Sequence, residues 1–132
     1  MERSHARRLL AKADEFALCA RTELAAERYS AAGLAAVHAA IAAADAVTAH
    51  TAGVVSTGTS HFAVVQLLQQ CLPEGLPTSA ERQLLGLLRS KNDIEYTERA
   101  LTGPETHVLV DQAVRFVRWS HRVAGGRGDL AP

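Results

Sequence analysis

The sequence YSAAGLAAVHAAIAAADAVTAH, residues 29–50, decides the fold. Its apolar side chains recur at helical spacing on one face: Leu34, Val37, Ile41, Ala44 and Val47. Alanine fills most other positions; it is the strongest helix former and loses no side-chain entropy on burial. Only a few polar residues interrupt the segment, among them His38 and Asp45. A helix with so few polar positions is predicted to lie at the centre of a protein, buried on two sides.

Four more helices are predicted around this segment from the spacing of apolar residues and from turn signals. They span about residues 4–27, 61–72, 79–102 and 104–124. Ser60 is expected to cap the third, and Thr78 or Ser79 the fourth. The last is expected to bury Val108, Val110, Ala113, Val114, Val117 and Val123. The sequence thus predicts an all-α, four- to five-helix up-down bundle. One domain is expected over residues 1–124, with a flexible tail at 125–132.

Composition narrows the classes of function. The 132 residues carry 14 basic and 14 acidic side chains, so the formal net charge is zero. A dedicated nucleic-acid binder usually has a positive net charge, so only a local basic patch is expected to contact phosphates. The charged N-terminus does not resemble a signal peptide, and a cytoplasmic location without membrane contact is expected. Cys19 and Cys71 occur in apolar surroundings and are predicted to be buried.

The fourth helix turns abruptly polar in the stretch RSKNDIEYTER, residues 89–99. The candidates for a ligand or dimer cleft in this cluster are Arg89, Lys91, Asn92, Glu95 and Tyr96. One interpretation is a solvated helix end in which Asp93 or Glu95 pairs with Arg89. The other is a functional face, because Arg89, Asn92 and Tyr96 lie about one turn apart. Such a face is suited to binding a phosphate or nucleotide, or to fixing a dimer.

Two histidines complete the candidate cleft residues. His38 lies on the central helix and is expected in the core or at an interface, and His61 begins the third helix beside the loop at residues 53–60. The sequence has no HxxxH, HxxE or CxxC spacing, so neither a metal site nor a cofactor is predicted.

A basic stripe is predicted on the last helix, where Arg115, Arg118 and Arg122 recur at three- and four-residue spacing. One interpretation is a solvated surface whose arginines pair with acids of the first helix such as Asp14 and Glu15. The other is a contact surface for RNA or for an acidic partner protein.

Three stretches together resemble the HEPN superfamily: ERYSAAGLAAVHAAIAAADAV (27–47), SHFAVVQLL (60–68) and LLRSKNDIEYTE (87–98). The first is similar to the family's small-residue second helix, and the second to a third helix that begins with histidine. The third resembles the family's Leu-Leu-x-x-Arg-Asn-x-x-x-Tyr region. The resemblance implies a four- or five-helix up-down bundle that dimerises through helices flanking the polar cluster.

Active members of that family carry an arginine, then four to six intervening residues, and then a histidine, and two protomers share the metal-independent ribonuclease cleft. In such a site the arginine stabilises phosphate charge and the histidine transfers a proton. Counted from Arg89, the histidine positions hold residues 94–96 (Ile-Glu-Tyr); counted from Lys91, they hold residues 96–98 (Tyr-Thr-Glu). Neither register supplies a histidine, so no catalytic residue is predicted.

The predicted function is therefore a non-catalytic, homodimeric binding or regulatory module, with RNA or a nucleotide as candidate ligand in a stress, toxin–antitoxin or defence pathway. Two alternatives stay open. One is a degenerate, metal-independent ribonuclease that uses Arg89 with a displaced histidine such as His38 or His61. The other is a structural helical partner of another protein, which an uncovered apolar patch would favour.

Overall fold

The part of the chain that the structure describes folds into five α-helices. The computed structural model describes residues 2–56 and 61–125. The helices are α1 (Glu2–Ala25), α2 (Tyr29–Ala52), α3 (His61–Cys71), α4 (Thr78–Tyr96) and α5 (Gly103–Ser120), and a π-helical turn, η1 (His121–Gly125), extends α5. Within those two ranges there is no strand, and the all-α prediction is confirmed. Of the predicted flexible tail at 125–132, all but Gly125 lies outside the described residues, as does the predicted cap Ser60.

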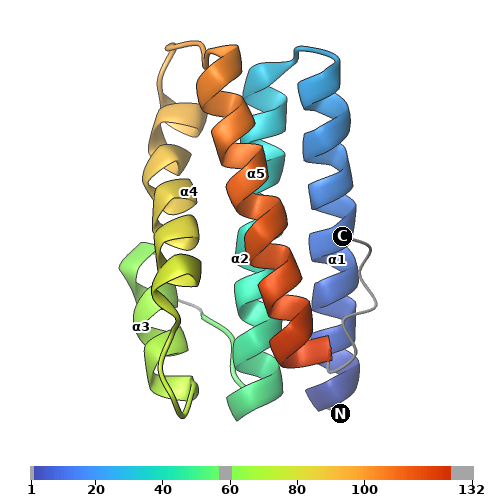
Figure 1. The fold of residues 1–132 in the computed structure, drawn as a ribbon, viewed down its shortest axis with the longest axis vertical. Helices are drawn as coiled ribbons and strands as arrows, with labels where there is room; N and C mark the ends of the chain where they lie inside the picture. The colour runs from blue at the N-terminus through green and yellow to red at the C-terminus, as the bar shows by residue number, and fades with distance from the viewer. Residues whose placement is uncertain (1, 57–60, 126–132) are drawn as a thin grey trace.

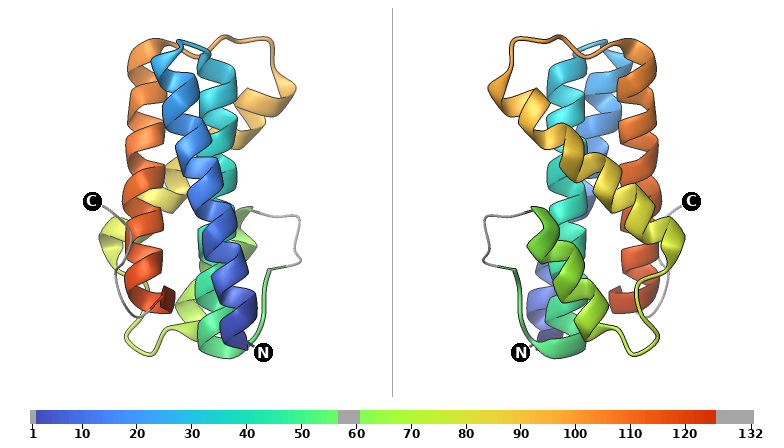
Figure 2. Two further views of the ribbon diagram at one scale, coloured as in Figure 1. Left: turned by 90° about the vertical axis from the view of Figure 1, so that its right-hand side faces the viewer. Right: turned by 90° about the vertical axis from the view of Figure 1, so that its left-hand side faces the viewer.

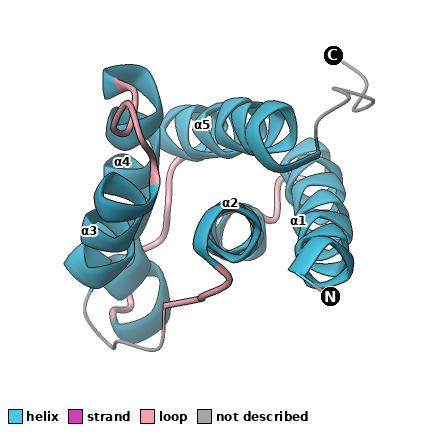
Figure 3. Ribbon diagram, turned by 90° about the horizontal axis from the view of Figure 1, so that it is seen from below, coloured by secondary structure: helices cyan, strands magenta, loops and turns pink. Residues whose placement is uncertain are grey.

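The helices surround α2. Viewed end-on, α1, α5 and the α3–α4 pair lie on three sides of it (Figure 3). Consecutive long helices run in opposite directions, α1 against α2 and α4 against α5 (Figure 1). Helix α4 crosses the others obliquely, and the short α3 lies near one end of the bundle (Figure 2). Helices α4 and α1 lie on opposite sides of α2, and both α2 and α5 contact the two of them.

The alanine-rich sequence of α2 places it at the centre. Its alanines from 39 to 46 are all buried, and most of them have no exposed surface. Among the described residues, α2 is the one helix long and apolar enough to cross a membrane by length and composition. However, 72% of its most apolar segment is buried inside the bundle, and the core helix of a soluble protein passes the same test. Helix α2 ends where Gly53 adopts a left-handed conformation (φ 70°), a common helix stop.

The fourth helix ends earlier than predicted. The expectation that it continues to residue 102 is wrong, because α4 ends at Tyr96 and Thr97 is extended. The Thr97 hydroxyl donates to the Asp93 carbonyl oxygen at 2.6 Å. Helix α5 then starts with a capping box: the Thr102 side chain accepts from the Glu105 N–H, and the Glu105 carboxylate accepts from the Thr102 N–H. The predicted caps Thr78 and Ser79 lie inside α4, whose N-cap is Pro77.

Two predictions of burial are wrong. Val108 is 54% exposed. The buried face of α5 includes the predicted Val110, and with it Leu109 and Phe116, which were not predicted. Leu109 and Phe116 belong to this face because α5 faces both α2 and α4, so its apolar face is wider than its valines suggest. Cys19 is exposed, and Cys71 is half-buried.

Asp45 is the acid of α2, half-buried, and its carboxylate accepts a hydrogen bond from the Ser56 backbone N–H. Burial raises the pKa of Asp45 although that hydrogen bond, Lys12 and His5 lower it. The folded state therefore binds a proton more readily than the unfolded state does. This contribution to stability falls as the pH rises from the ordinary carboxyl pKa of about 4 through the raised pKa of Asp45.

We expect Asp45→Asn to be more stable than the natural protein at neutral pH, because the amide stays neutral and its oxygen still accepts from Ser56. The gain in unfolding free energy should shrink as the pH is lowered toward 4. Urea unfolding of both proteins between pH 4 and pH 7 measures the difference. The opposite result would be a substitution that lowers the unfolding free energy, and lowers it more at neutral pH than at pH 4. That result would show that the ionised carboxylate stabilises the fold.

Candidate functional site

A cleft between α4 and α5 contains the first of the predicted site residues, Arg89. Its volume is about 370 Å³. Its lining comes from one face of α4 and one side chain of α5: Thr78, Glu81, Arg82, Leu85, Gly86, Arg89 and Gln112. We call it the α4–α5 cleft. The α4 residues recur at intervals of three or four because that spacing keeps side chains on one face of a helix.

Gly86 lets α5 approach α4 closely in the middle of this cleft. A Cβ atom on Gly86 would lie 3.0 Å from Gln112 Oε1 and 3.2 Å from Gln112 Nε2. Arg82 lies about one turn before Gly86, and Arg89 about one turn after it. The Gln112 amide thus lines the same cleft as the two arginines, and it can donate or accept a hydrogen bond there.

The two cleft arginines have no counter-ion among the described residues. Arg82 and Arg89 are exposed, and neither forms a hydrogen bond or ion pair with another described residue. The prediction that Asp93 or Glu95 pairs with Arg89 is wrong. Arg99 Nη2 lies 3.6 Å from Asp93 Oδ2, and Lys91 Nζ lies 2.8 Å from Glu95 Oε1.

An acid at one end limits the positive character of the cleft. Glu81 lines it and accepts a long hydrogen bond, 3.5 Å, from Gln69 of α3. With two arginines and one glutamate the lining carries a surplus of one positive charge. Arginine guanidinium groups suit phosphate because they bind it through paired N–H donors.

The rest of the polar cluster lies beyond the cleft. Lys91 and Glu95 bind each other, and neither lines the cleft. Asn92 and Tyr96 are exposed, and Tyr96, at 76%, is the most exposed large apolar side chain of the described residues. The helix carries Arg89, Asn92 and Tyr96 on one face, yet of these three only Arg89 lines the α4–α5 cleft.

The two candidate histidines do not join Arg89 in the described part of the chain. His38 packs against Phe16 of α1, with ring centroids 5.4 Å apart. It therefore faces α1, on the side of α2 away from α4 (Figure 3). His61 begins α3, and its side chain lies outside the described residues. A displaced histidine beside Arg89 stays a prediction for His61.

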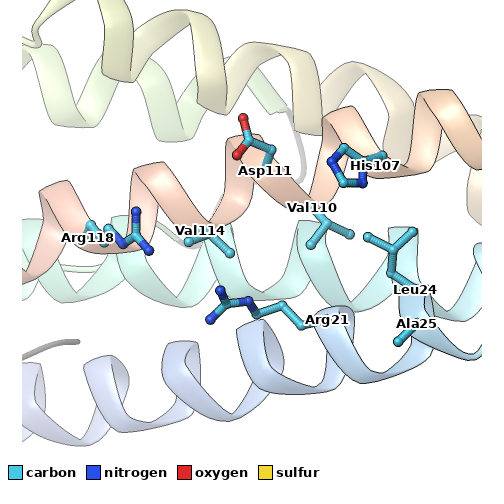
Figure 4. A pocket seen from close by; sticks show the side chains of 8 residues that line it. All are labelled: Arg21, Leu24, Ala25, His107, Val110, Asp111, Val114 and Arg118. Carbon is cyan, nitrogen blue, oxygen red and sulfur yellow. The ribbon is translucent and has the colours of Figure 1, made fainter. Parts of the chain in front are cut away.

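The basic stripe is divided between different surroundings. Arg115 pairs with Asp111 on its own helix, with Nε and Oδ2 3.1 Å apart, and Arg122 is exposed on η1. Arg118 enters a groove between α1 and α5 (Figure 4), where its Nε atom is buried without a hydrogen-bond partner. The predicted pairing with α1 acids is wrong for Asp14, which contacts His121 Nε2 at 2.8 Å.

Sequence reasoning missed Arg82, Gln112 and the α1–α5 groove. Arg82 precedes Arg89 by seven residues, two helical turns, so its place on the same face was available in the sequence. Gln112 belongs to another helix, and its position depends on how α5 packs. Within residues 2–56 and 61–125, no group of three or more His, Cys, Asp or Glu side chains is placed to hold a metal ion. Comparisons with protein-family models and with curated proteins find no match to this chain.

Proposed function

We propose that this chain is a non-catalytic helical binding module that holds a phosphate group of RNA or of a nucleotide in the α4–α5 cleft. The observation that carries the proposal is the pair Arg82 and Arg89. Both line one cleft without a counter-ion from the described residues, whereas Lys91 and Arg99, only a few residues further along the chain, have acidic partners. Cations kept free in a concave site are suited to an anion from outside.

The Gln112 amide favours a ligand that carries a base as well as a phosphate. It lines the cleft together with the two arginines, and an amide can pair with the edge of a base. No histidine lines the cleft among the described side chains, so the lining offers anion binding without the usual proton-transfer group of a metal-independent ribonuclease. The zero net charge of the chain fits a local contact rather than binding over a wide basic surface.

A second copy is part of the proposal, as the resemblance to the HEPN superfamily implies. The exposed Asn92 and Tyr96 continue the face of Arg89 past the cleft. Tyrosine is enriched at protein interfaces, because its ring buries a large area while its hydroxyl keeps a polar partner. Chromatography with light scattering checks the assembly, and a mass of twice the 14.1 kDa of the chain is expected.

Replacing the cleft arginines should weaken RNA binding without unfolding the protein. We expect Arg89→Ala to weaken the affinity for a short fluorescein-labelled single-stranded RNA about ten-fold, and Arg82→Ala combined with it by more, because each charge-assisted contact contributes about 1.5–3 kcal/mol. Fluorescence anisotropy at fixed salt measures the affinity, with ATP as competitor to separate nucleotide from RNA binding. Arg7→Ala, an exposed α1 arginine outside the cleft, is the matched control.

Two results would contradict the proposal. Equal RNA affinity of the natural protein and the Arg82→Ala/Arg89→Ala variant would show that the cleft does not bind RNA. Metal-independent cleavage of the RNA that Arg89→Ala eliminates would show a ribonuclease with a displaced histidine, and would overturn the non-catalytic part.

A further inference from the structure

A second concave surface runs between α1 and α5, away from the α4–α5 cleft. Two hollows of about 470 Å³ and 180 Å³ share three lining residues, Arg21, Val114 and Arg118, and so form one continuous groove. We call it the α1–α5 groove. Figure 4 shows Arg21 and Arg118 between the two helices, with Val110 and Leu24 further along. Its α5 wall reaches from His107 to Arg118, about 16 Å or three helical turns at 1.5 Å per residue.

The floor of the groove is apolar over this whole length. It is formed by side chains from both helices: Ala17, Leu24, Val110, Val114 and Val117. Leu18 stands on the α1 rim with 66% of its surface exposed. An apolar trough open along one side, between two antiparallel helices, is the shape into which a further amphipathic helix packs.

The acids that line the groove have partners, whereas its arginines have none among the described residues. Both acids of the lining are engaged, Asp111 with Arg115 at 3.1 Å and Asp14 with His121 at 2.8 Å. By contrast, Arg21 and Arg118 have no hydrogen bond or ion pair with any described residue. The Nε atom of Arg118 is buried without an acceptor, which is costly unless a partner supplies one. The groove thus has an apolar floor and two cations in need of anions.

We infer that the α1–α5 groove binds an acidic amphipathic helix of a partner protein. Apolar side chains at three- and four-residue spacing on that helix would cover Leu24, Val110 and Val114. Aspartate or glutamate beside them would accept hydrogen bonds from Arg21 and Arg118. A second copy of this chain does not fit the same groove, because a twofold contact would bring four arginines together. The inference concerns another face of α5 and does not depend on the phosphate proposal.

Three synthetic helical peptides with one apolar stripe test the inference, with Glu, Gln or Lys flanking the stripe. Fluorescence anisotropy should show the Glu peptide binding at least ten-fold more tightly than the Lys peptide, with the Gln peptide between them. Charge reversal by Arg21→Glu/Arg118→Glu should reverse this order. Backbone amide shifts on adding the Glu peptide should map to the lining of the groove. The control is Arg7→Glu/Arg122→Glu, which makes the same change of charge on α1 and η1 outside the groove lining. This variant should keep the natural protein's order of peptide affinities.

Several outcomes would overturn it. The Glu peptide could bind no better than the Lys peptide, or charge reversal could leave the order of peptide affinities unchanged. Either result would show that the two arginines do not recognise the partner helix. Dissociation of a dimer by Arg21→Glu/Arg118→Glu would assign the groove to a second copy. Binding of dodecanoate at the groove with no peptide binding would assign it to small amphiphiles. Circular dichroism shows whether the charge-reversed variant is folded; if it is not, Arg21→Gln/Arg118→Gln should abolish the preference for Glu over Lys.

Discussion

Phe116→Ala is expected to lower the free energy of unfolding by about 3–5 kcal/mol, the usual cost of emptying a phenylalanine site in a core. Phe116 is the largest side chain of the described residues with no exposed surface. Its ring also packs on Trp119, with centroids 5.4 Å apart and planes inclined by 43°. Helix α5, which carries Phe116, contacts α1, α2 and α4. Since domains of this size are stable by about 5–15 kcal/mol, much of the stability depends on this ring.

Urea unfolding followed by circular dichroism measures the loss as a lower midpoint with an unchanged slope. Val108→Ala is the matched control on the same helix, because Val108 is 54% exposed and should change the unfolding free energy by less than about 0.5 kcal/mol. Similar losses in both variants would show that Phe116 does not occupy the core.

Ala43→Leu is expected to destabilise the protein by about 1–3 kcal/mol or more, because extra methylene groups in a filled core force side chains and backbone to move. The neighbours of Ala43 one turn away in both directions, Ala39, Ala40, Ala46 and Val47, are fully buried like Ala43 itself. No direction is therefore open to a larger side chain. Leucine is a good helix former, so the loss would come from packing and not from helix propensity.

Thermal and urea unfolding of Ala43→Leu measure this effect, and Ala31→Leu is its control. Ala31 lies on the same helix but is exposed, so leucine there should leave stability within about 0.5 kcal/mol of the natural protein. If Ala43→Leu were as stable as Ala31→Leu, then α2 would not be the close-packed centre of the bundle.

The sequence predicts the fold well where one segment is decisive. The alanine-rich residues 29–50 give the central helix, because such a segment has no polar face to present to water. The end of α4 was missed although its signal was present. Thr102 and Glu105 have the spacing of a capping box, which requires the chain before Thr102 to leave the helix. Val108 was misplaced because α5 contacts three helices, and the width of an apolar face depends on all of them.

The candidate site was predicted in part. Arg89 was identified from the polar end of its helix, but its neighbours in the cleft come from packing. Gln112 lines the cleft with Arg89 because Gly86 allows α5 to approach α4 closely at this point. Helical spacing allows Glu95 to pair with Lys91, as it does. Spacing alone does not show which neighbouring cation an acid such as Glu95 pairs with. Arg118 looked like part of a solvated stripe, and only the contact between α1 and α5 places it in a groove.

The Nε–Hε resonances of the arginines test the central claim most directly, because they report contact at each guanidinium group during a titration with single-stranded RNA. Binding in the α4–α5 cleft predicts that the Arg82 and Arg89 resonances shift together and saturate at one RNA concentration, while that of Arg7 stays in place. Shifts confined to Arg115 and Arg122, or no shift at Arg82 and Arg89 at saturating RNA, would contradict it.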